Sequence, residues 1–172
     1  MENKVLDLLI QYNAVEFGDF TLASGIKSPY YIDVKTAIIN HPNLLNQIAK
    51  NIVDKYNFDV IAGVVVGGVP LAVAVSLESH KPCAIIRSTM KDHGKQQIVI
   101  GNVTGKHVLL VEDVTTSGQS SLYGVNELRN QGAIVDDVVV IVDRECGAEK
   151  LLASEGINLH SLVKSSELLK NK

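Results

Sequence analysis

Apolar and polar positions follow two periods along the chain. The first helical pattern lies in residues 2–13, with apolar side chains at Val5, Leu6, Leu8, Leu9 and Ile10. From residue 42 onward, short apolar runs typical of buried strands alternate with longer segments of helical period. The strands are predicted at 59–65, 83–86, 98–100, 107–111 and 135–142, and the helices at 42–56, 70–79, 118–131 and 146–155. This alternation is typical of an α/β fold with a central, mostly parallel sheet flanked by helices on both faces.

The two ends of the chain depart from the alternation. Short strand-like pieces at Phe20–Leu22 and Tyr30–Ile32 surround the turns Ser24-Gly25 and Ser28-Pro29. We expect the first ~40 residues to form a small cap, or hood, over the sheet. After the helix ending near residue 155 we expect only a charged tail, so that residues 1–172 make one domain.

Composition narrows the class of protein. Hydrophobic residues make up 46% of the chain and tryptophan is absent, so aliphatic side chains build the interior, which suits a parallel sheet buried on both faces. The net charge of −3 gives no bulk attraction to nucleic acid or to a membrane, and we expect neither as a partner. Cys83 and Cys146 have no cysteine near them, which favours small core residues and a reducing, cytoplasmic location.

The strongest chemical signal is the segment Val108-Leu-Leu-Val-Glu-Asp-Val-Thr-Thr-Ser-Gly-Gln-Ser120. It is interpreted as a buried strand ending in Glu112 and Asp113, followed by a hydroxyl-rich turn and a helix. The turn offers N–H groups and hydroxyls to a phosphate, whereas the two acids would repel one and suit a ribose diol or a bridging Mg²⁺. A ribose with a phosphate at one end and a diol at the other satisfies both halves. The alternative is an ordinary helix-capping loop.

Three further loops follow predicted strands. Gly67-Gly68-Val-Pro70 is either a close backbone approach to pyrophosphate or a tight turn. The cationic segment 87–97 is either a solvated hairpin or a lid that neutralises a polyphosphate. Arg144 in Asp143-Arg144-Glu145 suits a carboxylate ligand, or an ion pair with a neighbouring acid at the sheet rim. Ligands of open α/β sheets bind at the carboxyl ends of strands, so these loops are expected to converge.

These motifs carry a resemblance to a known family. The 108–120 segment resembles the phosphoribosyl-diphosphate (PRPP) motif of the type I phosphoribosyltransferases. From about Phe17 to Arg144 the chain resembles the orotate phosphoribosyltransferases. The specific signatures are Phe20-Thr-Leu…Ser-Gly-x-Lys-Ser-Pro-Tyr-Tyr31 and Arg87…Lys91-Asp-His93-Gly94. Without the resemblance, the first of these segments could equally be a surface hairpin.

The resemblance implies transfer of the 5-phosphoribosyl group from PRPP to orotate, giving orotidine 5′-monophosphate and pyrophosphate in UMP synthesis. It implies Mg²⁺ as cofactor, bound mainly through PRPP with no direct protein ligand, and a homodimer with shared active sites. The implied catalytic residues are Lys91, His93 and Asp113. The implied substrate-binding residues are Lys27, Tyr31, Gly67, Gly68, Arg87, Lys91, His93, Glu112, Asp113, Val114, Thr115, Thr116, Ser117, Gly118, Gln119, Ser120 and Arg144.

The roles follow by position. Glu112 and Asp113 would hold the ribose hydroxyls and residues 115–120 the 5′-phosphate, while Thr116 and Arg144 would contact orotate, bordered by the Tyr31 backbone. Arg87, Lys91 and His93 would contact the pyrophosphate, with Lys91 and His93 reaching into the neighbouring subunit's site.

Three positions depart from the pattern of many members. Ala23, Ser88 and Gly67 stand where a cation occurs in other members, and each loss removes one phosphate-facing charge. Three rival functions stay open: transfer to another base, PRPP sensing by a transcriptional regulator, and binding without catalysis. Arg144 favours a base that bears a carboxylate, whereas the acidic balance disfavours a regulator.

Overall fold

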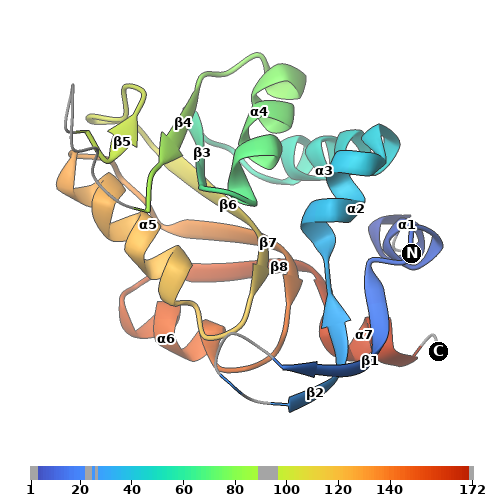
Figure 1. The fold of residues 1–172 in the computed structure, drawn as a ribbon. Coiled ribbons are helices and arrows are strands. Elements are labelled where there is room, and N and C mark those ends of the chain that lie inside the picture. The colour runs from blue at the N-terminus through green and yellow to red at the C-terminus, as the bar shows by residue number, and fades with distance from the viewer. Residues whose placement is uncertain (1–3, 22–24, 26, 89–96, 171–172) are drawn as a thin grey trace.

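The computed structural model describes residues 4–21, 25, 27–88 and 97–170. Its centre is a six-stranded sheet in the order β5-β4-β3-β6-β7-β8, parallel except for β5, which runs antiparallel to β4 (Figure 1). The strands are β3 (Val60–Val64), β4 (Cys83–Ile86), β5 (Val99–Ile100), β6 (Val108–Thr115), β7 (Asp137–Asp143) and β8 (Asn158–Lys164). The expected mostly parallel α/β sheet is thus confirmed.

Helices cover both faces of this sheet. They are α1 (Lys4–Gln11), α2 (Val34–Asn40), α3 (Pro42–Lys55), α4 (Gly68–Ser79), α5 (Gln119–Asn130), α6 (Ala148–Ser154) and α7 (Ser165–Lys170). Successive strand residues point to opposite faces, so Ile61, Leu109 and Val111 pack in one core with helices α1 to α4 and α7. Ala62 and Leu110 pack in a second core with α5 and α6.

Close packing of glycines sets the turn between β3 and α4. A Cβ at Gly68 would lie 2.7 Å from the Val111 carbonyl oxygen, and one at Gly63 would overlap the Gly68 backbone. Only residues without a side chain allow the start of α4 to approach β3 and β6 so closely. The turn 65–67, which contains a cis peptide bond between Val65 and Val66, is therefore held against the carboxyl end of β6.

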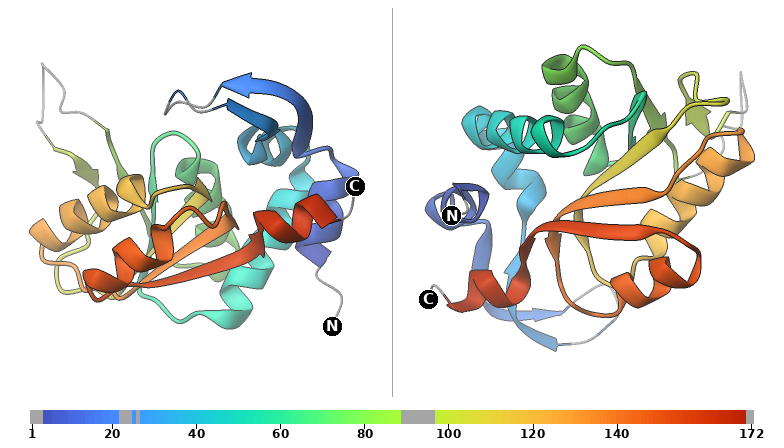
Figure 2. Two further views of the ribbon diagram at one scale, coloured as in Figure 1. Left: turned by 90° about the horizontal axis from the view of Figure 1, so that it is seen from below. Right: turned by 180° about the vertical axis from the view of Figure 1, so that it is seen from behind.

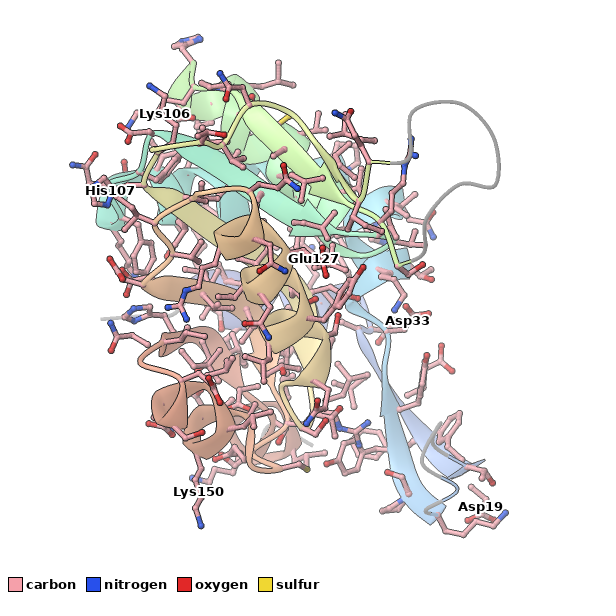
Figure 3. The ribbon with its side chains drawn as sticks, turned by 90° about the vertical axis from the view of Figure 1, so that its left-hand side faces the viewer. Asp19, Asp33, Lys106, His107, Glu127 and Lys150 are labelled. Carbon is pink, nitrogen blue, oxygen red and sulfur yellow. The ribbon has the colours of Figure 1, made fainter. Side chains whose placement is uncertain are left out.

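The N-terminal region adds a separate two-stranded sheet. Strands β1 (Val15–Thr21) and β2 (Lys27–Ile32) form an antiparallel hairpin, with Asp19 far out along it and Asp33 where it joins the body (Figure 3). The Asp33 side chain accepts a hydrogen bond from the Thr36 N–H and caps α2. The expected cap is thus a projecting hairpin, while α1 and α2 belong to the main core.

Three expectations from the sequence were wrong: one at the C-terminal end of the chain, one in β6, and one at Cys146, which was expected in the core but is exposed. The supposed charged tail contains β8, which pairs in parallel with β7, and α7, which lies beside α1 (Figure 2). Strand β6 continues four residues beyond residue 111, because Glu112, Val114 and Thr115 keep pairing with β7. The two acids therefore lie within the strand, which continues two residues beyond Asp113. Helix α2 was also not anticipated.

Candidate active site

The four loops singled out in the sequence meet along one edge of the sheet. Strands β4, β3, β6 and β7 are consecutive neighbours and parallel, so their carboxyl ends lie together. These ends lead into the turns at 65–67 and 116–118, into Arg144, and into the segment that begins at Arg87. The expected convergence is confirmed for the parts of these loops that the structure describes.

The turn between β6 and α5 has the form expected of a phosphate-binding loop. Thr116 and Ser117 are exposed, and Gly118 takes a left-handed backbone (φ 84°) as the residue before α5. A side chain there would be strained, and its Cβ would lie 3.1 Å from Ala148. Two exposed hydroxyl residues and the start of a helix thus lie together at the sheet edge, a combination suited to a phosphate.

Glu112 faces α5 and is almost completely buried, with 5% of its surface exposed. Its Oε1 accepts a hydrogen bond from Ser120 Oγ at 2.6 Å, and its Oε2 accepts one from Ser121 Oγ at 3.0 Å. Burial raises the pKa of Glu112 above its ordinary value, although the two serine hydroxyls oppose this effect. The carboxylate thereby ties the end of β6 to the start of the helix that follows the phosphate loop.

Asp113 points to the opposite face of the sheet, toward α2 and the turn at Gly67. Its Oδ2 lies 3.2 Å from the Lys35 Nζ. A Cβ on Gly67 would overlap the Asp113 carboxylate, so the missing side chain leaves room for that group. Partial burial lowers the pKa of Lys35, but Asp113 and then Tyr31 and Asp33 raise it more, so the pKa lies above its ordinary value.

Arg144 follows β7 and lies under the cap hairpin. Its backbone N–H donates to the Thr115 carbonyl at 2.9 Å, and its guanidinium carbon lies 5.1 Å from the centre of the Tyr30 ring. The buried Nε has no hydrogen-bond partner among the residues that the structure describes. A buried guanidinium nitrogen without a partner is costly, which indicates an oxygen-bearing ligand here.

The acids beside Arg144 are engaged elsewhere. The Asp143 Oδ1 accepts from the Glu145 N–H at 2.8 Å. Glu145 has a positive φ of 58°, and its Oε2 accepts from the Ser166 N–H at 2.9 Å and from Ser165 Oγ at 3.2 Å. Within the described residues, neither acid forms the rim ion pair with Arg144 that the sequence left open as an alternative.

The cationic segment after β4 is anchored at both ends. The Arg87 N–H donates to the Ile98 carbonyl at 2.9 Å, its carbonyl accepts from the Tyr123 hydroxyl at 2.8 Å, and β4 pairs with β5. The two ends of the segment are therefore paired, which both interpretations allow. Lys91 and His93 lie outside the described residues.

Two residues of the cap hairpin make their contacts within the hairpin. The Tyr31 ring packs 5.6 Å from the Phe20 ring, and Lys27 donates to the Thr21 hydroxyl at 2.8 Å, across the hairpin. Lys27 is thus engaged within the cap and not with the sheet edge. Ala23 lies outside the described residues.

Two absences hold for the described part of the chain. It contains no group of three or more His, Cys, Asp or Glu side chains placed to hold a metal ion. None of its helices is long and apolar enough to span a membrane.

Lys35 is the site residue that sequence reasoning missed. The available signal was a lysine two residues after the helix cap Asp33, in the first helical turn, where the helix dipole disfavours a cation. Such a position implies a nearby acid, but the sequence did not say which, because Asp113 is 78 residues away.

Comparison with known proteins agrees with this geometry. Residues 35–159 match the phosphoribosyl transferase domain family. The orotate phosphoribosyltransferase of Methanocorpusculum labreanum is 69% identical over 98% of this chain and 99% of its own length, and that of Methanoculleus marisnigri is 55% identical over the same shares. The crystal structure of orotate phosphoribosyltransferase from Aeropyrum pernix superposes with a TM-score of 0.86 at 31% identity, covering 97% of each chain. The chain belongs to the orotate phosphoribosyltransferases.

Proposed function

We propose that this protein transfers the 5-phosphoribosyl group of PRPP to orotate, giving orotidine 5′-monophosphate and pyrophosphate for pyrimidine synthesis. The observation that carries the proposal is the meeting of a phosphate-type turn, Asp113 and the unpartnered Arg144 Nε at one sheet edge. Together they fit a phosphate, a ribose diol and a carboxylate, which are the recognisable groups of the two substrates. The full-length similarity to orotate phosphoribosyltransferases supports the same reaction.

The residues divide the work by chemistry. Residues 115–120 bind the 5′-phosphate, and Asp113 accepts hydrogen bonds from the ribose hydroxyls. The Glu112 carboxylate can accept about four hydrogen bonds, and the two serine hydroxyls occupy two of these positions. It therefore retains positions for a ribose hydroxyl. Arg144 binds the orotate carboxylate beside Tyr30. The remaining assignments, including Tyr31, Gly67, Gly68, Arg87, Lys91 and His93, are proposed on the family pattern.

The chemistry needs little from the protein beyond positioning. A ring nitrogen of orotate attacks C1 of the ribose, the bond to pyrophosphate breaks, and positive charge develops on the sugar, as in glycoside transfer. Catalysis then comes from holding the two substrates in line and from cations that stabilise the leaving pyrophosphate. In this proposal Lys91 is the foremost of these cations.

The Mg²⁺ requirement is part of the proposal. Oxygen ligands suit Mg²⁺, which is typically held by one or two carboxylates together with substrate phosphates. On the family pattern the ion has no direct protein ligand and is bound mainly through PRPP, and Asp113, which lies beside the Gly67 turn, would bind the ribose hydroxyls of the same complex. Mg²⁺ bound with PRPP would neutralise pyrophosphate charge. A cytoplasmic location also stays a prediction.

The direct test follows the ultraviolet absorbance of orotate with PRPP and Mg²⁺. We expect orotate to be consumed, and the reaction to stop when Mg²⁺ is chelated. Folded protein that leaves orotate unchanged would contradict the proposed function.

Base selection is tested at Arg144. Replacing Arg144 with Gln removes the charge-assisted contact, and we expect kcat/KM for orotate to fall by at least about tenfold to hundredfold. Uracil, which lacks the carboxylate, should be a poor substrate for both proteins. Equal use of uracil and orotate by the wild type would favour the rival in which another base is the substrate.

A homodimer is the proposed assembly, and an apolar groove supports it. The groove, of about 510 Å³, runs from the turn at Val65 and Val66 along α4 and is also lined by Ile39 of α2. Val66 is 73% exposed, Leu77 71% and Ile39 62%. Exposed apolar patches of this kind mark protein interfaces, and a partner here would sit next to the Gly67 turn. A second copy in this groove would place the two active sites near the interface.

The assembly is tested by placing a charge in the groove. Leu77→Glu should convert the dimer to monomer in sedimentation, and Ile134→Glu, an exposed apolar position away from the groove, should not. Mixing inactive Lys91→Ala and Asp113→Asn proteins should restore activity if the sites are shared. A wild-type monomer, or no recovery despite subunit exchange, would contradict this part of the proposal.

A further inference from the structure

The pyrophosphate turn of this chain brings no cation of its own. Its central residue is Gly67, which is packed against the Asp113 carboxylate. A pyrophosphate bound over this turn would lie beside an aspartate, and two like charges in contact repel each other. A positive group is therefore needed at this point, in addition to backbone N–H groups.

Lys35 places a positive group there from another part of the chain. Its Nζ lies 3.2 Å from Asp113 Oδ2, while Gly67 approaches the same carboxylate. The lysine belongs to the first turn of α2, two residues after Asp33, which lies at the junction of hairpin and body (Figure 3). Its position is thus between the cap and the sheet edge, on the Asp113 side of β6.

The Lys35 contact is suited to exchange. The lysine side chain is 48% exposed, and exposed ion pairs contribute little to stability. An ammonium carries three donors on a flexible stem, so one bond to Asp113 leaves two for another acceptor. When a ribose diol donates its own hydrogen bonds to Asp113, the most negative acceptor left within reach of the ammonium is pyrophosphate.

We propose that Lys35 is a pyrophosphate-binding residue of this site, which pairs with Asp113 in the free enzyme and contacts the pyrophosphate of bound PRPP. This inference rests on the proposed function, because it takes PRPP as the donor. It assigns to α2 the cation that the turn at Gly67 does not supply. On PRPP binding, the ion pair would therefore separate. Asp113 would bind the ribose hydroxyls, and Lys35 would bind the pyrophosphate.

The test measures by calorimetry how tightly the protein binds each half of PRPP separately. Inorganic pyrophosphate with Mg²⁺ is titrated into wild type, Lys35→Met, Lys35→Arg and the control Lys50→Met, which alters an exposed lysine of α3. We expect Lys35→Met to weaken pyrophosphate binding by about tenfold to hundredfold, as for loss of a charge-assisted hydrogen bond. Lys35→Arg should restore most of the affinity, and Lys50→Met should match wild type.

Ribose 5-phosphate is the second probe, because it lacks the pyrophosphate. We expect Lys35→Met to bind it within about twofold of wild type, since one exposed ion pair is a small contribution. Unchanged pyrophosphate affinity, or weakened binding of ribose 5-phosphate alone, would overturn the proposal and leave Lys35 as a support for Asp113. Equal weakening of both probes would overturn it too. Neither titration uses orotate, so failure of the proposed function in the orotate assay is a separate result.

Discussion

Glu112 and Asp113 are adjacent in sequence and opposite in environment. Glu112 points to the α5 side of the sheet, is buried, and has each oxygen bonded to a serine of the helix that it faces. Asp113 points to the α2 side, and its described partner is a half-exposed lysine. One strand thus delivers two carboxylates into two different surroundings.

The difference shows how one motif combines rigidity with exchange. The Glu112 contacts are satisfied before any ligand binds, so this side of the motif is preorganised and contributes to the fold. The Asp113 contact is made to a half-exposed lysine, although the acid itself is only 13% exposed, so a ligand can replace the lysine at little cost. Changes on the two sides should therefore separate stability from activity.

The largest effect should come from Asp113→Asn. Loss of the carboxylate charge that faces the ribose should lower kcat by about 10²–10³-fold, the range seen when one well-placed electrostatic group is removed. The melting temperature should stay near that of wild type, because only an exposed ion pair is lost. A strongly destabilised Asp113→Asn protein would show that Asp113, like Glu112, is needed for the stability of the fold.

Ser121→Ala should have the next largest effect, on stability. Ser121 is fully buried and donates to Glu112 Oε2, so its loss leaves a buried carboxylate oxygen without that partner. We expect a loss of about 1–3 kcal/mol in the free energy of unfolding, measured by urea denaturation. The control Ser154→Ala, at an exposed serine of α6, should change stability by less than about 0.5 kcal/mol.

Gly67→Ala should weaken the donor site with little change in the fold. The added Cβ would overlap the Asp113 carboxylate, which can rotate away because it is the end of a flexible side chain. Asp113 then leaves Lys35, and we expect KM for PRPP to rise by roughly tenfold, as for one lost hydrogen bond. Steady-state kinetics with wild-type KM would show that Asp113 need not keep this position.

The smallest effect should be a pH-dependent gain in stability from Glu112→Gln. Burial raises the pKa of Glu112, so the folded state binds more protons than the unfolded state between the two pKa values. The ionised wild type is therefore penalised at neutral pH, and this penalty disappears as the pH falls below about 4.3, the ordinary glutamate value. Glu112→Gln should melt at a higher temperature than wild type at pH 7, and this advantage should vanish in acid. An advantage that persists in acid would point to packing instead.

Much of the fold could be predicted because its signals are local. The run Cys83–Ile86 is bounded by a proline and an arginine and is a strand with those limits, and Pro42 begins α3 as expected of a first-turn proline. The alternation of elements then fixes a parallel sheet, which places the carboxyl ends at one edge. The position of the phosphate turn and of Arg144 followed from this reasoning.

The missed features depend on distant partners. Strand β8 has a half-exposed, weakly apolar pattern, and it is a strand because Asp137–Asp143 lies beside it. Strand β6 runs through two acids because β7 continues to pair with it. Lys35 reaches Asp113 only after the chain has folded, so their contact could not be predicted from local spacing.

The short β5 strand bears on how copies of this chain avoid misassociation. An unpaired sheet edge is a template onto which a strand of another molecule can add. Here the edge beside β4 is closed by a strand of two residues, Val99 and Ile100, much shorter than the five or six of an average strand. Such an edge offers too few free backbone groups to begin a cross-molecule sheet, and α6 and α7 contact the opposite edge strand β8. At this edge of the six-stranded sheet, backbone pairing with another copy of the chain is therefore disfavoured.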